Sequence, residues 1–445
     1  MTGLIEMCFE KLPVLNLLIK KSLSSIGPEP LANTTVVYVH HALASSLSLL
    51  KAKIQLGLQP KNIFVLNKHY SECRSVVLDI KNLNVNYQPC SEQVSLGRFS
   101  HSFAYDISLL WHKVLSTKQE TDNLIIMDHG GYALNYIPLE ILKMYNVIGI
   151  EKTTGGFLNG NLEGLPFPII DIATCAAKKI LESPLIAEAV VAKLMPLIPI
   201  KQNHLTCGVI GYGAIGKAIA KKLTSMGHRV ITHDKNSCEP EKKQENELIV
   251  IDNLTAAIGF SDYIFGCTGR DIASSIDLFR LCPKDKVLIS CSSEDKEFLS
   301  LIQYIQRKQP ITHVNPLSDI IWKNDVGANI RIVRGGFPVN FDGSNESVPN
   351  KDIQLTRALV LAGALQAVEF FKKNNNLIKQ SRIYMLNPNI QKFIVNHWVK
   401  VQNPGRFDQA IISKFQDEKW IIKNSGGIYF KDSALMTNDC AVGTL

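Results

Sequence analysis

The sequence of 445 residues predicts an α/β protein, and three observations support this prediction. Residues 206–236 follow a strand, glycine turn, helix and strand pattern that contains a complete GxGxxG motif. Short β-branched runs alternate with apolar-striped helical segments before this stretch, and more such runs follow it. Alternating strands and helices are typical of parallel sheets that carry helices on both faces. We therefore expect two Rossmann-like parallel-sheet domains with a C-terminal extension.

The elements can be assigned in chain order. In the first domain, we expect helices over 1–30 and 42–56 and strands over 35–39, 62–66, 124–127 and 147–150. An apolar helix over 173–197 then leads to Pro196 and Pro199, which are typical of a domain junction. In the second domain, strands are expected over 207–210, 230–234, 248–251, 262–266, 287–290 and 330–333.

A strongly apolar helix from Ile353 to Phe371 is expected to be buried and to return the chain to the first domain. One further helix is predicted near 389–401. The expected domains are a substrate-type domain over 1–200, completed by the helix 352–373, an NAD-binding domain over 201–351, and an extension over 374–445.

Composition narrows the function classes. Apolar residues make up 46% and charged residues 20%, as in ordinary globular proteins. The net charge of +8 is spread along the chain, so nucleic-acid binding is not expected. The ten cysteines show no CxxC or zinc-type spacing, which favours a reducing compartment and no metal. Without a predicted signal peptide or spanning helix, we expect a cytoplasmic protein that does not enter membranes.

The glycine motif predicts a dinucleotide site. Gly211 allows a sharp turn, Gly213 lets the backbone approach a pyrophosphate, and Gly216 lets the helix pack on the strand. The N–H groups of Ala214 and Ile215 open the helix and face the phosphates. Asp234 follows about eighteen residues on, where a carboxylate accepts the ribose hydroxyls and repels a 2′-phosphate. NAD is therefore the expected cofactor.

Polar side chains follow four strands of the first domain. They are His40-His41, Asn67-Lys68-His69, Asp128-His129 and Glu151-Lys152. Because the carboxyl ends of parallel strands share one edge of the sheet, we expect one site there. The plainer interpretation is that strand ends always meet polar loops, that His41 caps a helix, and that Lys178 with Lys179 is a solvated pair.

The order of these parts resembles the S-adenosylhomocysteine hydrolase family over roughly residues 30 to 372. GYGAIGK at 211–217 is similar to the family's GYGxVGKG, and Glu151-Lys152-Thr153-Thr154-Gly155 is similar to its ETTTG segment. His41 stands where the family has its HMT histidine, and Lys178 falls on the family's catalytic lysine. Thr268-Gly269 is similar to its TTG turn near the nicotinamide.

This resemblance implies site residues. It assigns catalytic roles to Lys178, His129, Glu151, His41 and Glu182, and cofactor contacts to Thr153, Thr154, Thr268 and Gly269. Lys178 would act at a substrate hydroxyl if its pKa were lowered by burial or a neighbouring cation. His129 replaces a carboxylate of the family's DDGGD segment and is a competent base near neutral pH. The family also implies a homo-oligomer.

The substrate shell departs from the family. Its NxGHFD loop reads Ser290-Cys291-Ser292-Ser293-Glu294-Asp295, without the histidine, and its GHP segment reads Asn340-Phe341-Asp342. We therefore expect an enzyme that uses bound NAD to oxidise a hydroxyl of a nucleoside-like or other small polar substrate, and not S-adenosylhomocysteine itself.

Two alternatives remain. One is a conventional NAD-dependent dehydrogenase of the D-2-hydroxyacid type, which needs an arginine, a carboxylate and a histidine in the cofactor half. Arg270 or Arg334 with His313 would have to fill that role. The other is a catalytically silent NAD-binding regulator, favoured by the missing loop histidine.

Overall fold

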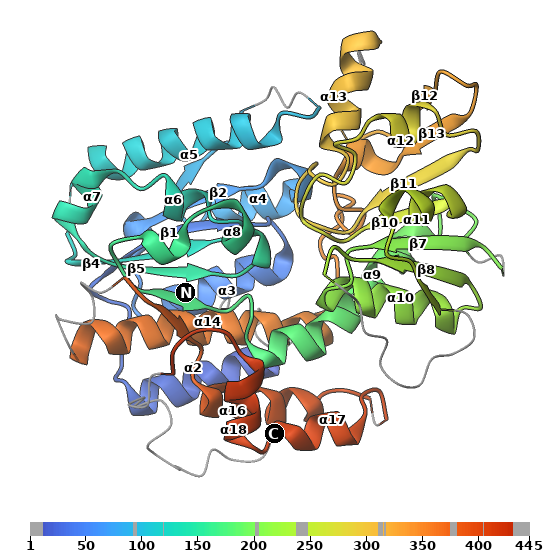
Figure 1. Cartoon of the computed structure of the whole chain (residues 1–445). Coiled ribbons are helices and arrows are strands. Elements are labelled where there is room, and N and C mark those ends of the chain that lie inside the picture. Colours follow the sequence, from blue (N-terminus) through green and yellow to red (C-terminus); the bar gives the residue numbers. More distant parts are fainter. Residues whose placement is uncertain are drawn as a thin grey trace. The chain divides into compact units, whose positions relative to one another are not determined.

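The computed structural model describes residues 12–91, 96–118, 120–200, 204–236, 248–309, 315, 317–373, 381–403 and 405–429. The chain divides into two compact units (Figure 1). Unit 1 takes its described residues from Met1–Cys90, Ala104–Glu182 and Gly343–Leu445, and unit 2 takes them from Ser91–Phe103 and Ser183–Asp342.

Unit 1 is built on a parallel sheet of seven strands in the order β14-β6-β5-β4-β1-β2-β3. The strands are β1 Thr34–His40, β2 Ile63–Asn67, β3 Asn86–Gln88, β4 Asn123–Asp128, β5 Asn146–Glu151, β6 Ile169–Asp171 and β14 Ile383–Met385. The first six follow the 3-2-1-4-5-6 order of doubly wound folds, in which the strand order reverses between β1 and β4. Ligands of such sheets bind at that reversal, beyond the strand carboxyl ends.

Helices cover this sheet. Their bounds are α2 Pro13–Ser25, α3 Ala44–Gln55, α4 Arg74–Lys81, α5 Phe99–Ser116, α6 Tyr132–Asn135, α7 Leu139–Met144, α8 Thr154–Asn159, α14 Asn350–Lys373, α16 Pro388–Lys400, α17 Gln409–Lys414 and α18 Glu418–Asn424. The apolar stretch Asn350–Lys372 is long and apolar enough to cross a membrane, but 94% of its window is buried. It is a core helix, which contacts α2, α3, α16 and the strands β4 and β5. Its burial agrees with the expectation from its composition.

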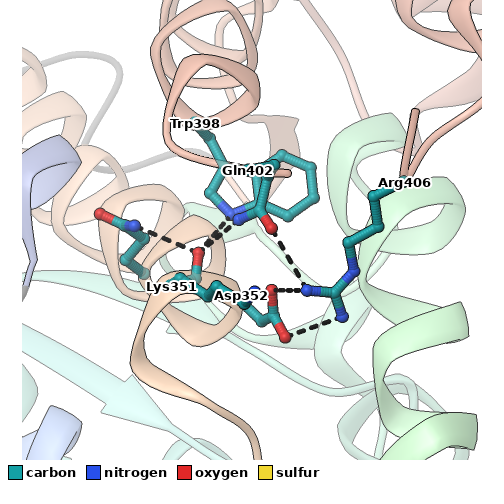
Figure 2. A network of polar contacts seen from close by, with 6 residues as sticks. Lys351, Asp352, Trp398, Gln402 and Arg406 are labelled. Atoms are coloured by element: carbon teal, nitrogen blue, oxygen red, sulfur yellow. Dashed lines mark hydrogen bonds and ion pairs between the residues drawn. The ribbon is translucent and has the colours of Figure 1, made fainter. Parts of the chain in front are cut away.

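The described part of the C-terminal segment lies in unit 1. Strand β14 pairs with β6, and the start of α14 is held by residues from α16 and the loop after it (Figure 2). Asp352 is 1% exposed and accepts two hydrogen bonds from the guanidinium of Arg406, at 2.6 and 2.9 Å. The carbonyl of Lys351 accepts from Trp398 Nε1 at 3.0 Å and Gln402 Nε2 at 2.6 Å. These contacts join the end of the described chain to the core.

Unit 2 carries a second seven-stranded sheet, in the order β12-β13-β11-β10-β7-β8-β9. Its strands are β7 Thr206–Ile210, β8 Arg229–His233, β9 Leu248–Val250, β10 Tyr263–Gly266, β11 Lys286–Ser290, β12 Ile320–Lys323 and β13 Asn329–Ile332, and only β12 is antiparallel to its neighbour. Its helices are α9 Ser183–Leu194, α10 Ala214–Ser225, α11 Leu254–Phe260, α12 Asp277–Arg280 and α13 Leu299–Lys308. Both units are therefore Rossmann-like, and the predicted α/β fold class is confirmed.

Two local differences from the predicted elements matter for the site. The helix expected over 173–197 begins later, because Lys178–Glu182 forms a π-helical turn, η4, before α9 starts at Ser183. Such turns are rare and often occur at functional sites. The short strands β3, β6, β12 and β14 were not predicted.

Candidate functional site

The glycine turn of unit 2 has the geometry of a dinucleotide site. Gly211 adopts φ +95°, which favours glycine, and a Cβ on Gly216 would lie 1.9 Å from the carbonyl oxygen of Gly211. A Cβ on Gly213, in contrast, would meet no atom of the described residues within 4 Å. Helix α10 starts at Ala214, and no side chain in the described part of the chain caps its first N–H groups. An open cradle at an uncapped helix start fits a pyrophosphate.

Asp234 closes this turn at the end of β8. Its Oδ2 accepts the N–H of Tyr212 at 2.7 Å and its Oδ1 accepts the N–H of Asn236 at 3.0 Å. The carboxylate is half-buried and therefore keeps a face open to solvent. Ala214 is exposed and Ile215 is half-buried at the helix start. These residues fit the adenosine half of NAD.

The turn at Thr268-Gly269 is held by Glu297, which the sequence analysis missed. Glu297 is fully buried and accepts from the N–H of Gly269 at 2.6 Å and from the hydroxyl of Ser292 at 2.6 Å. Thr268 Oγ1 lies 2.9 Å from its other carboxyl oxygen. Burial raises the pKa of Glu297 to about 7. A Cβ on Gly266 would meet this carboxyl group at 2.8 Å, so the glycine makes room for it.

In unit 1, two carboxyl groups stand side by side at the strand ends. Asp128 and Glu151 are paired in register on β4 and β5, and both are 0% exposed. Asp128 accepts the N–H groups of His129 at 2.7 Å and Leu134 at 2.9 Å. Burial raises the pKa of Asp128, and the backbone hydrogen bonds oppose this rise.

Glu151 is bonded through one oxygen only. Its Oε1 accepts the N–H of Gly130 at 3.1 Å and both the N–H and the hydroxyl of Thr153 at 2.7 Å. Its Oε2 is buried and has no hydrogen-bond partner among the described residues. Burial first, and then the charge of Asp128, raise the pKa of Glu151 to about 7. Thr153 immediately precedes α8, and Thr154 is the first residue of that helix. Through its two hydrogen bonds, Thr153 orients the carboxyl group of Glu151.

Two histidines meet at the reversal point between β1 and β4. His41 Nε2 lies 2.9 Å from His129 Nε2, and His41 Nδ1 contacts the hydroxyl of Ser71. The Ser71 hydroxyl donates to the carbonyl of Lys68 at 2.9 Å, so it accepts from Nδ1–H of His41. The Nε2 of a neutral His41 is then the acceptor, and His129 donates to it through Nε2–H. His129 Nδ1 is left as a lone-pair acceptor.

Both imidazoles are neutral at physiological pH. Burial lowers the pKa of His129 well below 6.5, and His41, Lys68, Lys152 and Lys178 lower it further. Burial also lowers the pKa of His41, with smaller effects from Lys68 and Arg357. His129 is half-buried. A neutral histidine that is oriented by a second group and partly open to solvent has the form of a general base.

Lys178 and Glu182 form an ion pair one turn apart in η4. Their side-chain atoms are 2.9 Å apart, and Glu182 also accepts the hydroxyl of Thr356 at 2.7 Å. Burial lowers the pKa of Lys178, but the charge and hydrogen bond of Glu182 outweigh this and raise it above its usual value. The lowered pKa expected for Lys178 is therefore not found, and Lys178 stays protonated. The positive charge of Lys178 also helps to lower the pKa of His129.

The five expected catalytic residues thus lie in unit 1, in two bonded pairs and one buried carboxyl group. His41 bonds His129, and Lys178 bonds Glu182. The fifth residue, Glu151, acts on the second of these pairs, because its charge helps to raise the pKa of Lys178. The sequence analysis named Lys152 beside Glu151 but gave it no role, and it missed Ser71 and Arg357. Ser71 carried a signal, because it follows His69 in the polar run after β2, whereas Arg357 carried none.

Lys152 is 5% exposed and donates to the carbonyl of Val39 at 2.7 Å. Its ammonium and that of the fully buried Lys53 lie 4.6 and 3.7 Å from the ring centre of Tyr38. Burial lowers the pKa of Lys152 to about 7, against the raising effect of Glu151 and Asp128. Two buried ammonium groups therefore lie against the ring of Tyr38 on β1.

The groups considered for a D-2-hydroxyacid mechanism lie in unit 2 or outside the described residues. Arg270 is exposed. Arg334 follows β13 with φ +52°, and its buried Nε has no hydrogen-bond partner among the described residues. His313 lies outside the described residues.

Comparison with known proteins decides the identity of unit 2. Residues 194–290 match the family "D-isomer specific 2-hydroxyacid dehydrogenase, NAD binding domain". Unit 2 is an NAD-binding domain. The match covers Gly211, Gly213, Gly216, Asp234, Thr268 and Gly269, and NAD, the predicted cofactor, is confirmed.

Membership of the S-adenosylhomocysteine hydrolase family is wrong. The segment that carried the strongest resemblance, GYGAIGK, lies inside the residues that match the 2-hydroxyacid dehydrogenase family. The physical reason is that a strand, glycine turn and helix around a pyrophosphate impose the same residues on many NAD-binding proteins. The hydrolase activity implied by that resemblance loses its basis with it, whereas the dehydrogenase alternative is favoured.

Two curated relatives from Mycobacterium tuberculosis, strains CDC 1551 and H37Rv, are uncharacterized proteins that are each 29% identical over 347 residues. The match covers 75% of this chain and 64% of theirs, so the chain spans less than two thirds of their length.

Similar solved structures share low identity. A formate dehydrogenase from Granulicella is 11% identical, with a TM-score of 0.34, over 56% of this chain and 71% of that one. An acyclic imino acid reductase in complex with NADPH and D-Arg is 14% identical, with a TM-score of 0.32, over 66% and 92%. A 2-hydroxyacid dehydrogenase from Ketogulonicigenium vulgare Y25 is 12% identical, with a TM-score of 0.30, over 52% and 74%.

Proposed function

We propose that this chain is an NAD-dependent dehydrogenase of the D-2-hydroxyacid type, which interconverts a small hydroxy acid and the corresponding oxo acid. The observation that carries the proposal is the match of residues 194–290 to the NAD-binding domain of that family. When bound, NAD accepts or donates a hydride at its nicotinamide ring. The chain's own residues then have to bind the substrate and move one proton.

We propose that His129 of unit 1 transfers the proton, in place of the histidine that D-2-hydroxyacid enzymes carry in the cofactor half. Its Nδ1 carries a free lone pair because Nε2–H is directed to His41, and its lowered pKa keeps it unprotonated. It therefore accepts the hydroxyl proton in the oxidative direction and, once protonated, returns it readily in the reductive direction. His41 and Ser71 position the imidazole without touching substrate.

The charged neighbours have supporting roles. Lys178 stays a cation beside His129, which opposes protonation of the imidazole and favours release of its proton. Glu151 holds the turn at Gly130 that carries His129. A homo-oligomer remains part of the proposal, and a mass measurement in solution tests it.

The test measures NADH oxidation with a panel of 2-oxo acids, glyoxylate, pyruvate and hydroxypyruvate, and with acetone as a ketone that lacks the carboxylate. At least one acid is expected to be reduced, and His129→Ala is expected to lower kcat by about 10²–10⁴-fold while NADH still binds. His112→Ala, an exposed histidine on α5, is the matched control and stays at the wild-type rate. A wild-type rate for His129→Ala would remove the assigned base, and turnover of acetone alone would contradict the acid substrate.

A further inference from the structure

Three side chains, at the end of β1, in α3 and in the loop before α14, have buried polar atoms without a partner among the described residues. Both ring nitrogens of His40, the hydroxyl of Ser46 and the Oε2 of Glu346 are buried without a hydrogen bond among the described residues. His40 is 2% exposed and Ser46 is 0% exposed. Because buried polar groups in native proteins are nearly always paired, such a group of orphans indicates a position that a ligand completes.

Helix α3 already holds a carboxylate at its start. The N–H of Ser45 donates to Oε1 of Glu346, while the N–H of Ala44 donates to the carbonyl of Asn345 at 3.0 Å. Leu43, the residue before the helix, gives no side-chain cap. The positive end of the helix dipole thus lies against an oxyanion that the chain itself supplies.

Arg357 on α14 reaches the same position. Its Nε donates to the hydroxyl of Ser45 at 2.9 Å, and it forms no ion pair with any described residue. Its charge acts on His40, on Lys152 and on Lys53, as their lowered pKa values indicate. A half-buried guanidinium without a carboxylate partner offers two N–H groups in the fork that binds carboxylates in bidentate fashion.

We propose that the start of α3 at Ser45 and the guanidinium of Arg357 form a binding site for the carboxylate of a small acid, and that Glu346 occupies this site in the present conformation. The site lies at the β1 carboxyl end, on the same loop as His41. That the bound acid is the substrate rests on the proposed function, whereas the presence of the carboxylate site does not.

The side chain of Glu346 is suited to give way to a bound carboxylate. One of its carboxyl oxygens is buried and unpaired, which costs free energy that a better-fitting anion would recover. Its neighbour Asn345 is anchored separately, because Asn345 Oδ1 accepts from Cys73 Sγ at 2.8 Å and its carbonyl accepts from Ala44. A rotation of the Glu346 side chain therefore clears the site and leaves the loop in place.

The two charged residues have opposite expected effects. Glu346→Gln removes the competing charge and is expected to tighten oxalate binding about tenfold, whereas Arg357→Gln is expected to weaken it at least tenfold. Glu140→Gln, which removes an exposed carboxylate on α7, is the matched control and leaves the affinity unchanged. Calorimetric titration of the full chain, without NAD, with oxalate or inorganic phosphate at constant ionic strength measures these affinities.

A permanent helix cap behaves differently. If Glu346 only capped α3, Glu346→Gln would lower the melting temperature and leave oxalate affinity unchanged, which overturns the proposal. Phosphate bound as tightly as oxalate by the wild type overturns the assignment to carboxylates. The titration involves no turnover, so it tests this site separately from the proposed function. If oxalate binds with the expected variant effects but no oxo acid is reduced, the site is upheld and the proposed function is rejected. If an oxo acid is reduced but oxalate binding does not respond to the variants, the proposed function is upheld and the site is rejected.

Discussion

Nε2 of His41 lies 2.9 Å from Nε2 of His129, at the ends of strands β1 and β4. These strands are neighbours in the sheet although 82 residues separate His40 from Asn123 in the chain, because β2 and β3 extend the sheet on the other side first. The contact ties the two loops at the strand-order reversal, where ligands of such sheets bind. It also transmits the tautomer of one imidazole to the other.

Ser71 is expected to fix that tautomer. In Ser71→Ala, Nδ1 of His41 loses its acceptor, so His41 can carry its proton on Nε2 and turn Nε2 of His129 into the acceptor. Nδ1 of His129 then carries the proton and no longer serves as a base. We expect kcat for oxo-acid reduction to fall about tenfold, the equivalent of one hydrogen bond of about 1.4 kcal/mol, with unchanged NADH affinity.

Steady-state kinetics with fluorescence titration of NADH measures both quantities. Ser108→Ala on the exposed side of α5 removes a comparable hydroxyl and serves as control. Equal kcat values for Ser71→Ala and wild type would mean that the proton positions of this pair do not matter.

The glycine turn gives a prediction about folding and cofactor binding together. Gly216→Ala puts a Cβ 1.9 Å from the carbonyl oxygen of Gly211, so α10 has to move from β7 and the pyrophosphate cradle opens. We expect both lower stability and loss of NAD affinity. Gly259→Ala on α11 is the matched control, since a Cβ there meets no atom within 4 Å and alanine favours a helix by about 0.5–1 kcal/mol.

Urea unfolding and NAD titration separate the two effects. Gly213→Ala refines the test, because its Cβ also meets no protein atom and would affect only a ligand in the cradle. If Gly213→Ala bound NAD like the wild type, the phosphates would not lie against that residue.

Glu297 predicts a pH dependence of stability in unit 2. Its pKa rises from 4.5 to about 7 on folding, so the folded state holds the proton more tightly than the unfolded state. The contribution is fully present below pH 4.5 and is lost as the pH rises through 7. A shift of this size is worth about 3 kcal/mol. Relative to Glu297→Gln, the wild type is expected to lose about that much stability between pH 5 and pH 8.

Urea unfolding of both proteins at each pH gives the difference. Glu140→Gln, at an exposed position, is expected to run parallel to the wild type. Parallel curves for Glu297→Gln and wild type would show that Glu297 is ionised in the folded protein.

The fold and the NAD turn followed from the sequence because both depend on local patterns. Apolar or β-branched runs of four or five residues mark β1, β4, β5 and β7, and Gly211 and Gly216 are each needed for a local reason. The polar cluster at the strand ends followed from topology, since parallel strands bring their carboxyl ends together.

The partners of those polar residues could not be predicted. Arg357 lies 312 positions from Ser45, to which it donates, and Glu346 reaches the start of α3 from a loop between distant elements. The protonation of Lys178 depends on Glu182 lying 2.9 Å away in a π-helical turn, which no periodicity reveals. The family assignment failed for a related reason, because a short motif set by local geometry is shared by many families.

The C-terminal segment is expected to stabilise unit 1 through one buried ion pair. Arg406 reaches from the loop after α16 to Asp352 at the start of α14, and the side chains are 19% and 1% exposed (Figure 2). Removal of Arg406 takes the guanidinium from the buried carboxylate of Asp352, and breaking a buried ion pair typically costs about 3–5 kcal/mol. Arg406→Ala is therefore expected to lower the free energy of unfolding by about that amount, as measured in urea.

An exposed ion pair provides the control. Lys61 and Glu120 are 2.5 Å apart with side chains that are 64% and 40% exposed, so solvent screens them and Lys61→Ala is expected to unfold like the wild type. Asp352→Asn in the Arg406→Ala background removes the stranded charge and is expected to restore part of the loss, because the neutral amide costs less to bury. If the double variant were no more stable than Arg406→Ala, the loss would come from the packing of the arginine stem and not from the charge of Asp352.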